Sequence, residues 1–333
     1  MTVSQRLLLT CQSARLSLPL RSAQFSPAVV LHHIWRKHFG KRSASAAVFL
    51  LSLSVLSKMA CADGLEGLGI LLDGGYSYDS NLTNASNPAD KRSDSALVLN
   101  LGGSKAVTLT DHTRWVLSGF IEAKGFARYG GLDRVSADAE AEYMYRPSGE
   151  FAAPTFGMVT GLGRDEFRSD LRKNDHYSAG ITLRQPLTDR INAFAAVKDN
   201  VSHSDSDVFN TRYTSTQINV DYGLGNGNTL YLTTEYRMGD IVSTSQPALA
   251  YREVATAFIN DDVFSSGPPM RDYRLKGKTA LARLGYNLPL EGKRSLDFSW
   301  RYARSASDLA PGYDSSPIKY VGNQFSVDYL MGF

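Results

Sequence analysis

The chain has 333 residues, a formal net charge of +3 and 43% hydrophobic residues. Beyond residue 62 no stretch approaches the ~20 consecutive apolar residues of a membrane-spanning helix, which excludes a helical membrane protein. Both cysteines, Cys11 and Cys61, lie within the first 62 residues. A disulfide framework is therefore excluded for the remainder.

Residues 1–62 differ from everything that follows, because they contain no Asp or Glu and eight basic residues. Lys41 and Arg42 precede an apolar run from Ala46 to Leu56, which is followed by Ala60-Cys61-Ala62. A basic segment, a short apolar segment and a small-residue cleavage site predict a secretory signal peptide cut after Ala62. The folded domain is then residues 63–333.

Other interpretations of this leader remain open. Met59-Ala60-Cys61 could be a lipoprotein site, although Lys58 stands where an aliphatic residue is needed. Residues 1–40 are similar to an organellar transit peptide, and a downstream start codon or an extended basic region would also explain the length. Without the leader the chain has 28 basic and 33 acidic residues, a charge of −5. No nucleic-acid partner is therefore expected.

About twelve segments of the mature chain alternate apolar and polar residues. In the clearest, Val135 to Tyr145 place small and aromatic residues at odd positions, while charged residues such as Asp138 and Glu140 take even positions. A helix, with its period of 3.6, would not sort charges in this way. In the tenth segment the alternation stays in phase only if the register slips near Gly277. The predicted strands are 68–78, 95–109, 114–128, 134–145, 154–167, 174–185, 190–202, 211–223, 228–240, 271–288, 296–302 and 318–333.

The connections between these strands also alternate. Those after even-numbered strands are short and centre near Asp111, Ser148, Thr188, Gly225 and Gly292. The longest ones follow odd-numbered strands, at 79–93, 241–270 and 304–317. Short turns at one end, long loops at the other and an even strand count are typical of outer-membrane barrels.

The closing strand carries the most specific resemblance. Val321, Phe325, Val327, Tyr329, Met331 and Phe333 share one face, and Leu330 is the only apolar residue on the other. This pattern resembles the last strand of Gram-negative outer-membrane β-barrels, which ends in Phe and is read by the barrel-assembly machinery. Tyr78-Asp79-Ser80-Asn81 is also similar to the opening of porin-like barrel families. The resemblance implies an all-β, transmembrane, antiparallel up-and-down barrel of about twelve strands in the bacterial outer membrane. Phe325, Val327, Tyr329, Met331 and Phe333 would form the insertion signal.

Charged residues on the polar faces cannot face lipid cheaply, because an Arg or Lys at the bilayer midplane costs about 2–4 kcal/mol. They are therefore expected to line the lumen, either as ion-paired belts that brace the wall or as rings of a hydrated channel. Both signs are present, so no charge selectivity is predicted. The expected lumen-lining residues are Asp73, Glu122, Lys124, Arg134, Asp138, Glu140, Glu142, Arg164, Arg184, Lys198, Asp221, Glu235, Arg237, Arg283, Asp297, Arg301 and Asp328.

The longest connection, 241–270, contains Ala248 to Asn260, which could form a short helix. Long barrel loops constrict the bore or cover it from outside. We expect a constriction or lid with Arg252 and Glu253 as its polar groups; a surface loop without a role in transport is the alternative.

An enzymatic alternative rests on the predicted outer rim. Outer-membrane phospholipases use a His and a Ser near the outer leaflet, and His203 and Ser206 lie just past the seventh strand. Their spacing differs from the phospholipase pattern, and a group that orients the base is missing from the motif. No phosphate loop, dinucleotide fingerprint or metal-spaced Cys/His cluster is present, so no metal or cofactor is predicted. The oxygen-rich runs at 79–81 and 260–262 could hold Ca²⁺ but are usually plain loops.

The sequence thus favours a porin-like channel for diffusion or binding of small hydrophilic solutes. The bilayer, lipopolysaccharide and the barrel-assembly machinery are the other expected partners. Two alternatives remain: an outer-membrane lipid hydrolase of phospholipase or lipid A deacylase type, and a non-conducting scaffold or translocator whose outer loops bind a partner. Fold analogy alone does not choose among them.

Overall fold

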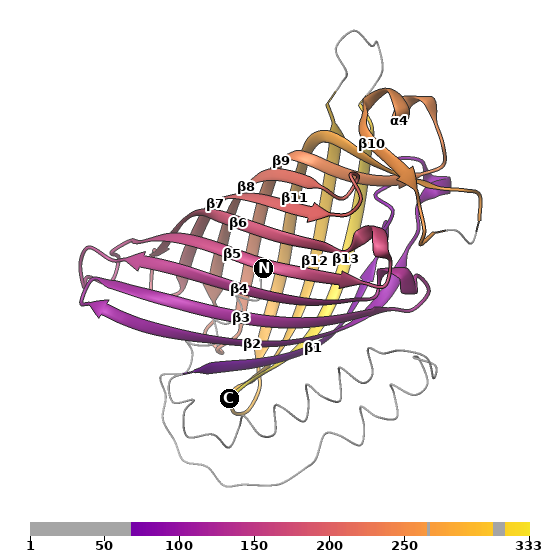
Figure 1. The fold of residues 1–333 in the computed structure, drawn as a ribbon. Helices are drawn as coiled ribbons and strands as arrows, with labels where there is room; N and C mark the ends of the chain where they lie inside the picture. Colours follow the sequence, from indigo (N-terminus) through magenta and orange to yellow (C-terminus); the bar gives the residue numbers. More distant parts are fainter. Residues whose placement is uncertain (1–67, 265–266, 309–316) are drawn as a thin grey trace.

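The computed structural model describes residues 68–264, 267–308 and 317–333, which form one closed antiparallel β-barrel (Figure 1). The leader and its cleavage position after Ala62 lie outside the described residues. The barrel strands are β1 (Gly69–Asp79), β2 (Asp94–Thr110), β3 (Thr113–Phe126), β4 (Arg134–Tyr145), β5 (Thr155–Phe167), β6 (Asn174–Pro186), β7 (Ile191–Ser204), β8 (Thr211–Gly223), β9 (Thr229–Ser245), β11 (Arg271–Pro289), β12 (Arg294–Ser307) and β13 (Lys319–Gly332).

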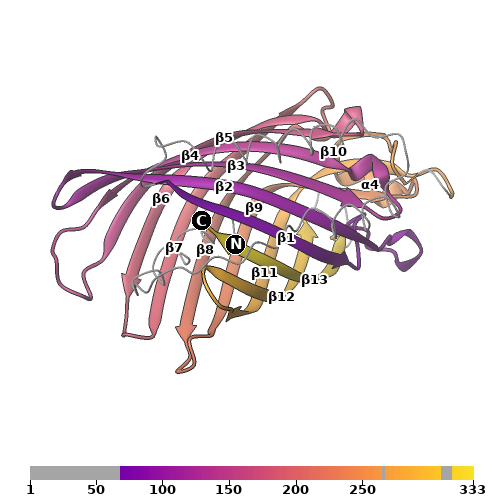
Figure 2. The same ribbon diagram turned by 90° about the horizontal axis from the view of Figure 1, so that it is seen from below.

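Each barrel strand pairs with the next along the chain, and β1 also pairs with β13, which closes the wall. Figure 2 shows β1 lying between β2 and β13. Tyr76, for example, lies opposite Leu97 on β2 and Val327 on β13. Closure satisfies the backbone groups of every strand, as a wall in contact with hydrocarbon requires. The prediction of a twelve-stranded all-β barrel is confirmed.

The two faces of the wall differ as the alternation predicts. On β13, Phe325 is 53% exposed on the outer face, whereas Asp328 on the inner face of the same strand is 7% exposed. Large apolar side chains such as Met158 and Ile181 are among the most exposed of the molecule. A closed barrel with an apolar outer band and a polar inner face has the surface of a transmembrane barrel.

The two ends of the barrel also differ. One end carries short turns, and Gly227 and Gly292 there adopt positive φ angles of 85° and 73°, which the turns require. The start of β1 and the end of β13 both lie at this end of the barrel, where the Phe333 amide donates to the Ile70 carbonyl. The long loops gather at the opposite end, called the outer end below (Figure 1).

Two local expectations about the tenth predicted strand and its preceding loop need correction. The β9–β11 and β11–β12 ladders pass through Gly277 without a register shift, so no slip occurs. Residues 248–260 are only half helical. Helix α4 (Leu249–Val254) is followed by a short strand, β10 (Ala255–Asn260), which pairs with the outer end of β11. In the part of the chain that the structure describes, no helix is long and apolar enough to cross a membrane.

Candidate functional site

Strand β5 presents glycines to the interior, and this lets its two neighbours touch. Gly157, Gly161 and Gly163 lie on its inner face. A Cβ at Gly157 would collide with Thr182 of β6 and Glu142 of β4. The side chains of β4 and β6 therefore meet directly across β5, inside the barrel.

The inner surface formed by Gly157, Gly161 and Gly163 of β5 is called the glycine floor below. Ion pairs cross it inside the barrel. Glu142 on β4 receives two hydrogen bonds from Arg184 on β6, of 2.6 and 2.9 Å, and the Glu142 side chain is almost fully buried. Glu140 accepts from Lys198 of β7 at 3.0 Å. Because β4 and β7 are not neighbours in the wall, this contact must run through the interior. Nearer the outer end, His176 of β6 contacts Asp138 of β4 at 2.6 Å.

The facing wall, β9, β11 and β12, carries three arginines on its inner face: Arg237, Arg283 and Arg301. Arg237 makes two hydrogen bonds to Glu235, of 2.7 and 3.0 Å. Arg301 donates to the Gln324 side chain at 3.3 Å. This wall therefore carries three guanidinium groups on its inner face, whereas β4 carries the carboxylates of Asp138, Glu140 and Glu142.

Two further predicted lumen residues, Glu122 and Lys124, lie on β3. Arg134 of β4 donates to the Glu122 carboxylate at 3.2 Å through Nε, and its Nη2 makes a second bond to the same oxygen. The Lys124 ammonium lies 5.0 Å from the centre of the Phe126 ring. These contacts bring the basic and acidic residues of neighbouring strands together on the inner face.

The turn end of the interior is acidic. Asp297 and Asp328 lie directly opposite each other in the β12–β13 ladder, and the Tyr231 hydroxyl donates to Asp297 at 2.8 Å. Asp73 accepts from an asparagine of β2, and Asp221 from one of β8. Leu71 and Leu330 form a small apolar cluster with Phe120. Leu330, the apolar exception in the closing strand, is thus explained by an internal contact.

Arg164 was expected in the lumen, and this expectation is wrong. It lies on the outer face of β5 between Leu162 and Glu166, and its side chain is 59% exposed. It pairs there with Glu166 at 2.7 Å and Asp175 at 3.3 Å. The rule that charges face inward fails at this position because the outer ends of the strands extend beyond the hydrocarbon, where charge is tolerated. The remaining predicted lumen residues lie on the inner face.

The outer end is covered by a folded cap built on an extension of β9 and β11. In the wall, outer-face positions are exposed, yet both Thr244 and Asp272 on that face are buried. On the other face, Ser243, Tyr273 and Leu275 are completely buried. Burial of both faces means that residues 241–245 and 271–275 lie outside the lipid-facing band, inside a compact cap.

The loop between β1 and β2 crosses the mouth to reach this extension. Asn81 donates to the Val321 carbonyl of β13, and the Thr244 amide of β9 donates to the Thr83 carbonyl at 2.7 Å. Ser243 donates its hydroxyl to the Asn84 carbonyl at 2.7 Å. Strands β11, β12 and β13 separate β1 from β9 in the wall, so the loop spans part of the opening.

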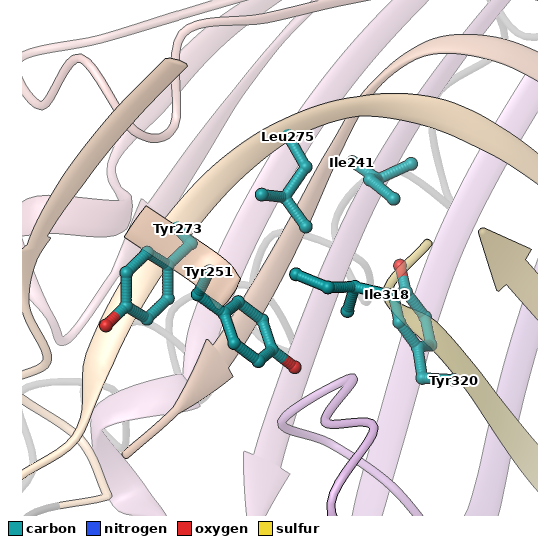
Figure 3. Packing of buried hydrophobic residues seen from close by; sticks show 6 residues of the cluster. All are labelled: Ile241, Tyr251, Tyr273, Leu275, Ile318 and Tyr320. Atoms are coloured by element: carbon teal, nitrogen blue, oxygen red, sulfur yellow. The ribbon is translucent and has the colours of Figure 1, made fainter. Parts of the chain in front are cut away.

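Tyr251 of α4 anchors the cap from within. It packs in a buried cluster with Ile241, Tyr273, Leu275, Ile318 and Tyr320, which come from β9, β11 and the β13 end (Figure 3). The ring centroids of Tyr251 and Tyr273 are 4.9 Å apart. Arg252 and Glu253, the expected polar groups of a lid, lie beside this anchor. Arg252 is exposed and stacks on the Phe258 ring.

Arg172, a buried cation, joins the cap to the other loops. This residue ends the short 3₁₀ turn η4 (Asp170–Arg172) between β5 and β6. Its guanidinium contacts Asp261 at 2.8 Å, Asp262 at 2.6 Å and Asp272 at 3.1 Å. The guanidinium carbon of Arg172 also lies 4.8 Å from the centre of the Phe209 ring in the β7–β8 loop.

Three carboxylates around one guanidinium leave an excess of negative charge. Burial raises the pKa of Asp272 to about 6, the nearby Arg172 acts in the opposite direction, and Asp261 adds to the rise. Thr244 donates its hydroxyl to the same carboxylate. Asp272 therefore gains or loses its proton near pH 6.

One cavity of about 650 Å³ opens beside the cap. Its lining includes Ser86 and Asp90 of the β1–β2 loop, Gln246 and Tyr251 before and within α4, and Lys319 at the start of β13. The lining mixes polar and apolar groups, and Gln246 bonds to Asp90 at 2.7 Å.

The residues of the enzymatic alternative are not brought together. His203 lies on the outer face and contacts the Tyr177 ring edge-on, with ring centroids 6.3 Å apart. The Ser206 hydroxyl is buried without a hydrogen-bond partner, and no bond joins it to His203 among the described residues. Nor do the described residues contain a group of three or more His, Cys, Asp or Glu placed to hold a metal ion.

Sequence reasoning missed the residues that organise this region, namely Arg172, Tyr251 and the inner glycines of β5. The glycines carried a signal, because they recur at every second position, at 157, 161 and 163, with one exception at Val159. Arg172 and Tyr251 stand in loops, where no periodicity marks a buried side chain.

No protein-family model matches the sequence, and no curated protein matches it. Solved structures do resemble the fold. An outer-membrane channel from Pseudomonas putida F1 superposes with a TM-score of 0.50 at 12% identity, covering 80% of this chain and 96% of that one. The KdgM porin in complex with disordered oligogalacturonate has a TM-score of 0.38 at 12% identity, over 79% and 99% of the two chains. The toluene transporter TodX of Pseudomonas putida has a TM-score of 0.41 at 9% identity, over 82% and 90%. At this level of identity the likeness describes the fold.

Proposed function

We propose that this protein is a bacterial outer-membrane channel for small hydrophilic solutes. The observation that carries the proposal is the inner face itself. Side chains of opposite charge line a closed barrel whose outer face is apolar, and ion pairs such as Glu140–Lys198 reach across the interior. A polar interior within an apolar wall is the arrangement that conducts water-soluble molecules through a membrane.

The charge pattern supports a weakly selective channel. The acidic row of β4 faces the arginines of β9, β11 and β12, so a solute would pass between groups of both signs. Rings dominated by one sign produce strong selectivity, and this interior has none that extends along the bore. The solute class is therefore small, hydrophilic and not restricted to one charge.

Planar bilayers test the proposal directly. The purified mature barrel should give discrete conductance steps in potassium chloride, with a reversal potential near zero in a salt gradient. Arg172→Ala, which removes the cation that joins the cap to the other loops, should increase the fraction of time spent open. Silence of both the wild-type protein and Arg172→Ala would contradict a channel and favour a scaffold that binds a partner through its outer loops.

The proposal extends to targeting and assembly. Residues 1–62 act as the leader, with cleavage after Ala62. Phe325, Val327, Tyr329, Met331 and Phe333 form the signal for the assembly machinery; most of this row is exposed on the outer face. Deleting Phe333 should reduce the amount of assembled barrel in outer-membrane fractions, whereas Phe151→Ala, at an equally exposed turn phenylalanine, should leave it unchanged. Equal amounts of both variants would argue against the signal.

A further inference from the structure

The outer ends of β11, β12 and β13 carry a group of outward cations, called the basic patch here. Its members are Lys276, Lys278, Arg304 and Lys319, and all four are exposed. Lys278 and Lys319 lie on the same rung, because both are opposite Ala306 of β12. Arg304 lies two residues before Ala306 on β12, toward the turn end, and its side chain is on the same face as Lys278 and Lys319. Strands are about 4.8 Å apart, so these three cations fit within a patch roughly 10 Å wide.

Most of this positive charge is not neutralised within the described residues. Lys276 pairs with Asp240 at 2.7 Å. Lys278, Arg304 and Lys319 have no carboxylate within ion-pair distance among residues 68–264, 267–308 and 317–333. Within the described residues the basic patch therefore carries a net positive charge, which suits it to an anion that approaches from the side.

Three other outward cations of the rim, all in the β5–β8 sector, are paired. Arg164 lies against Glu166 and Asp175, and Arg212 lies 2.7 Å from Asp199. Lys173 pairs with Asp170 at 2.7 Å. Lys278, Arg304 and Lys319 therefore differ from these three cations in having no carboxylate partner among the described residues.

The position of the basic patch along the strands indicates its depth in the membrane. Directly toward the turn end on the same outer face lie Tyr302 and Trp300 of β12, followed by Phe298. Trp and Tyr rings mark the boundary between hydrocarbon and headgroups. The basic patch thus stands just beyond the apolar band, at the depth of lipid headgroups in the outer leaflet.

We propose that the basic patch binds the phosphate groups of a phosphorylated glycolipid of the outer leaflet, with the acyl chains lying against the apolar surface of β11–β13. This inference rests on the proposed membrane location and not on conductance. A lipid phosphate is favoured over free phosphate because the patch continues into an exposed apolar surface that includes Trp300, Phe298 and Leu284. Lysine and arginine near a membrane surface each strengthen anion binding about fivefold.

The test uses native mass spectrometry of the purified mature barrel in detergent, with diphosphorylated lipid A as the probe. The triple variant Lys278→Gln/Arg304→Gln/Lys319→Gln should bind about a hundredfold more weakly than the wild type. The matched control, Arg164→Gln/Lys173→Gln/Arg212→Gln, removes three paired cations of the same rim and should change binding less than threefold. Circular dichroism checks that each variant keeps its strand content.

Two further arms identify the source of the phosphate. Lipid A stripped of its phosphates should bind the wild type as weakly as intact lipid A binds the triple variant. Inorganic phosphate at the same concentration should not displace intact lipid A. Equal loss in both triple variants, or displacement by inorganic phosphate, would overturn the proposal. Neither result depends on whether the barrel conducts, so failure here is distinguishable from failure of the channel proposal.

Discussion

Arg172 and Asp272 lie 3.1 Å apart, although 100 residues separate them in the chain. The first ends a turn between β5 and β6, and the second begins β11 on the other side of the long loop. Their contact, with Asp261 and Asp262 around the same guanidinium, fastens the cap to the loops of the opposite sector. The attachment of the cap to the β5–β6 loop therefore depends on this buried cluster.

Removal of Arg172 should loosen the cap without unfolding the barrel. Arg172→Ala leaves three carboxylates without their cation, and loss of one partner of a buried pair costs about 3–5 kcal/mol. We expect faster amide hydrogen exchange in residues 241–262, measured by mass spectrometry, and unchanged exchange in β1–β4. Arg168→Ala, at an exposed arginine of the same loop, is the control. Unaltered exchange in Arg172→Ala would show that Tyr251 alone holds the cap.

The stability of the cap should depend on pH. The pKa of Asp272 is about 6 in the cap, above the ordinary value of 3.8, so the folded cap binds the proton more tightly than the unfolded segment. The resulting stabilisation is complete below about pH 4 and is lost as pH rises from about 4 to about 6. A shift of this size corresponds to at most about 3 kcal/mol.

Limited proteolysis of residues 241–270 at pH 4.5 and pH 7 measures this dependence. Cleavage should be slower at pH 4.5 with an acid-tolerant protease calibrated on an unfolded peptide. Asp272→Asn fixes the neutral form and should remove most of the difference, while Asp262→Asn, at the half-exposed neighbour, should keep it. A cap that becomes more resistant as pH rises would contradict the assignment.

The inner glycines of β5 should not tolerate larger residues. At Gly157 a Cβ would overlap Thr182 and Glu142, and at Gly163 it would overlap Asp138 and His176. Gly157→Val should destabilise the barrel by about 1–3 kcal/mol through overpacking. Urea unfolding followed by tryptophan fluorescence gives the free energy. Gly149→Val, in a turn with open space around it, is the control, and equal values for both would refute the glycine floor.

Glu142 should influence both stability and ion preference. Glu142→Gln removes the negative partner of Arg184 and leaves a largely buried guanidinium without its counter-charge, at a cost of about 1–3 kcal/mol. The added positive charge should shift the reversal potential in a salt gradient toward anions. Glu166→Gln removes a carboxylate that pairs with an arginine on the outer face and should leave the reversal potential unchanged. The same shift in both variants would place Glu142 outside the conducting path.

Much of the wall was predictable from residue order. Period-two alternation defines which face of a strand is apolar, and the short turns set where strands end. All twelve barrel strands and their short turns therefore follow from local pattern. Phe325, Val327 and Tyr329 lie on the outer face as the alternation predicts. Arg164 shows the limit of the same reasoning, because a charged residue is expected to face inward only where its strand lies within the hydrocarbon layer.

The sequence by itself determined the strands, their faces and the long-loop end, because each depends on neighbours two to ten residues away. Only the tertiary structure decided that Arg172 meets three aspartates, that Tyr251 packs between β9, β11 and the start of β13, and that Lys278 and Lys319 share a rung. These contacts join loops and strands from distant parts of the chain. They exist only after the wall has closed and brought the loops to one end.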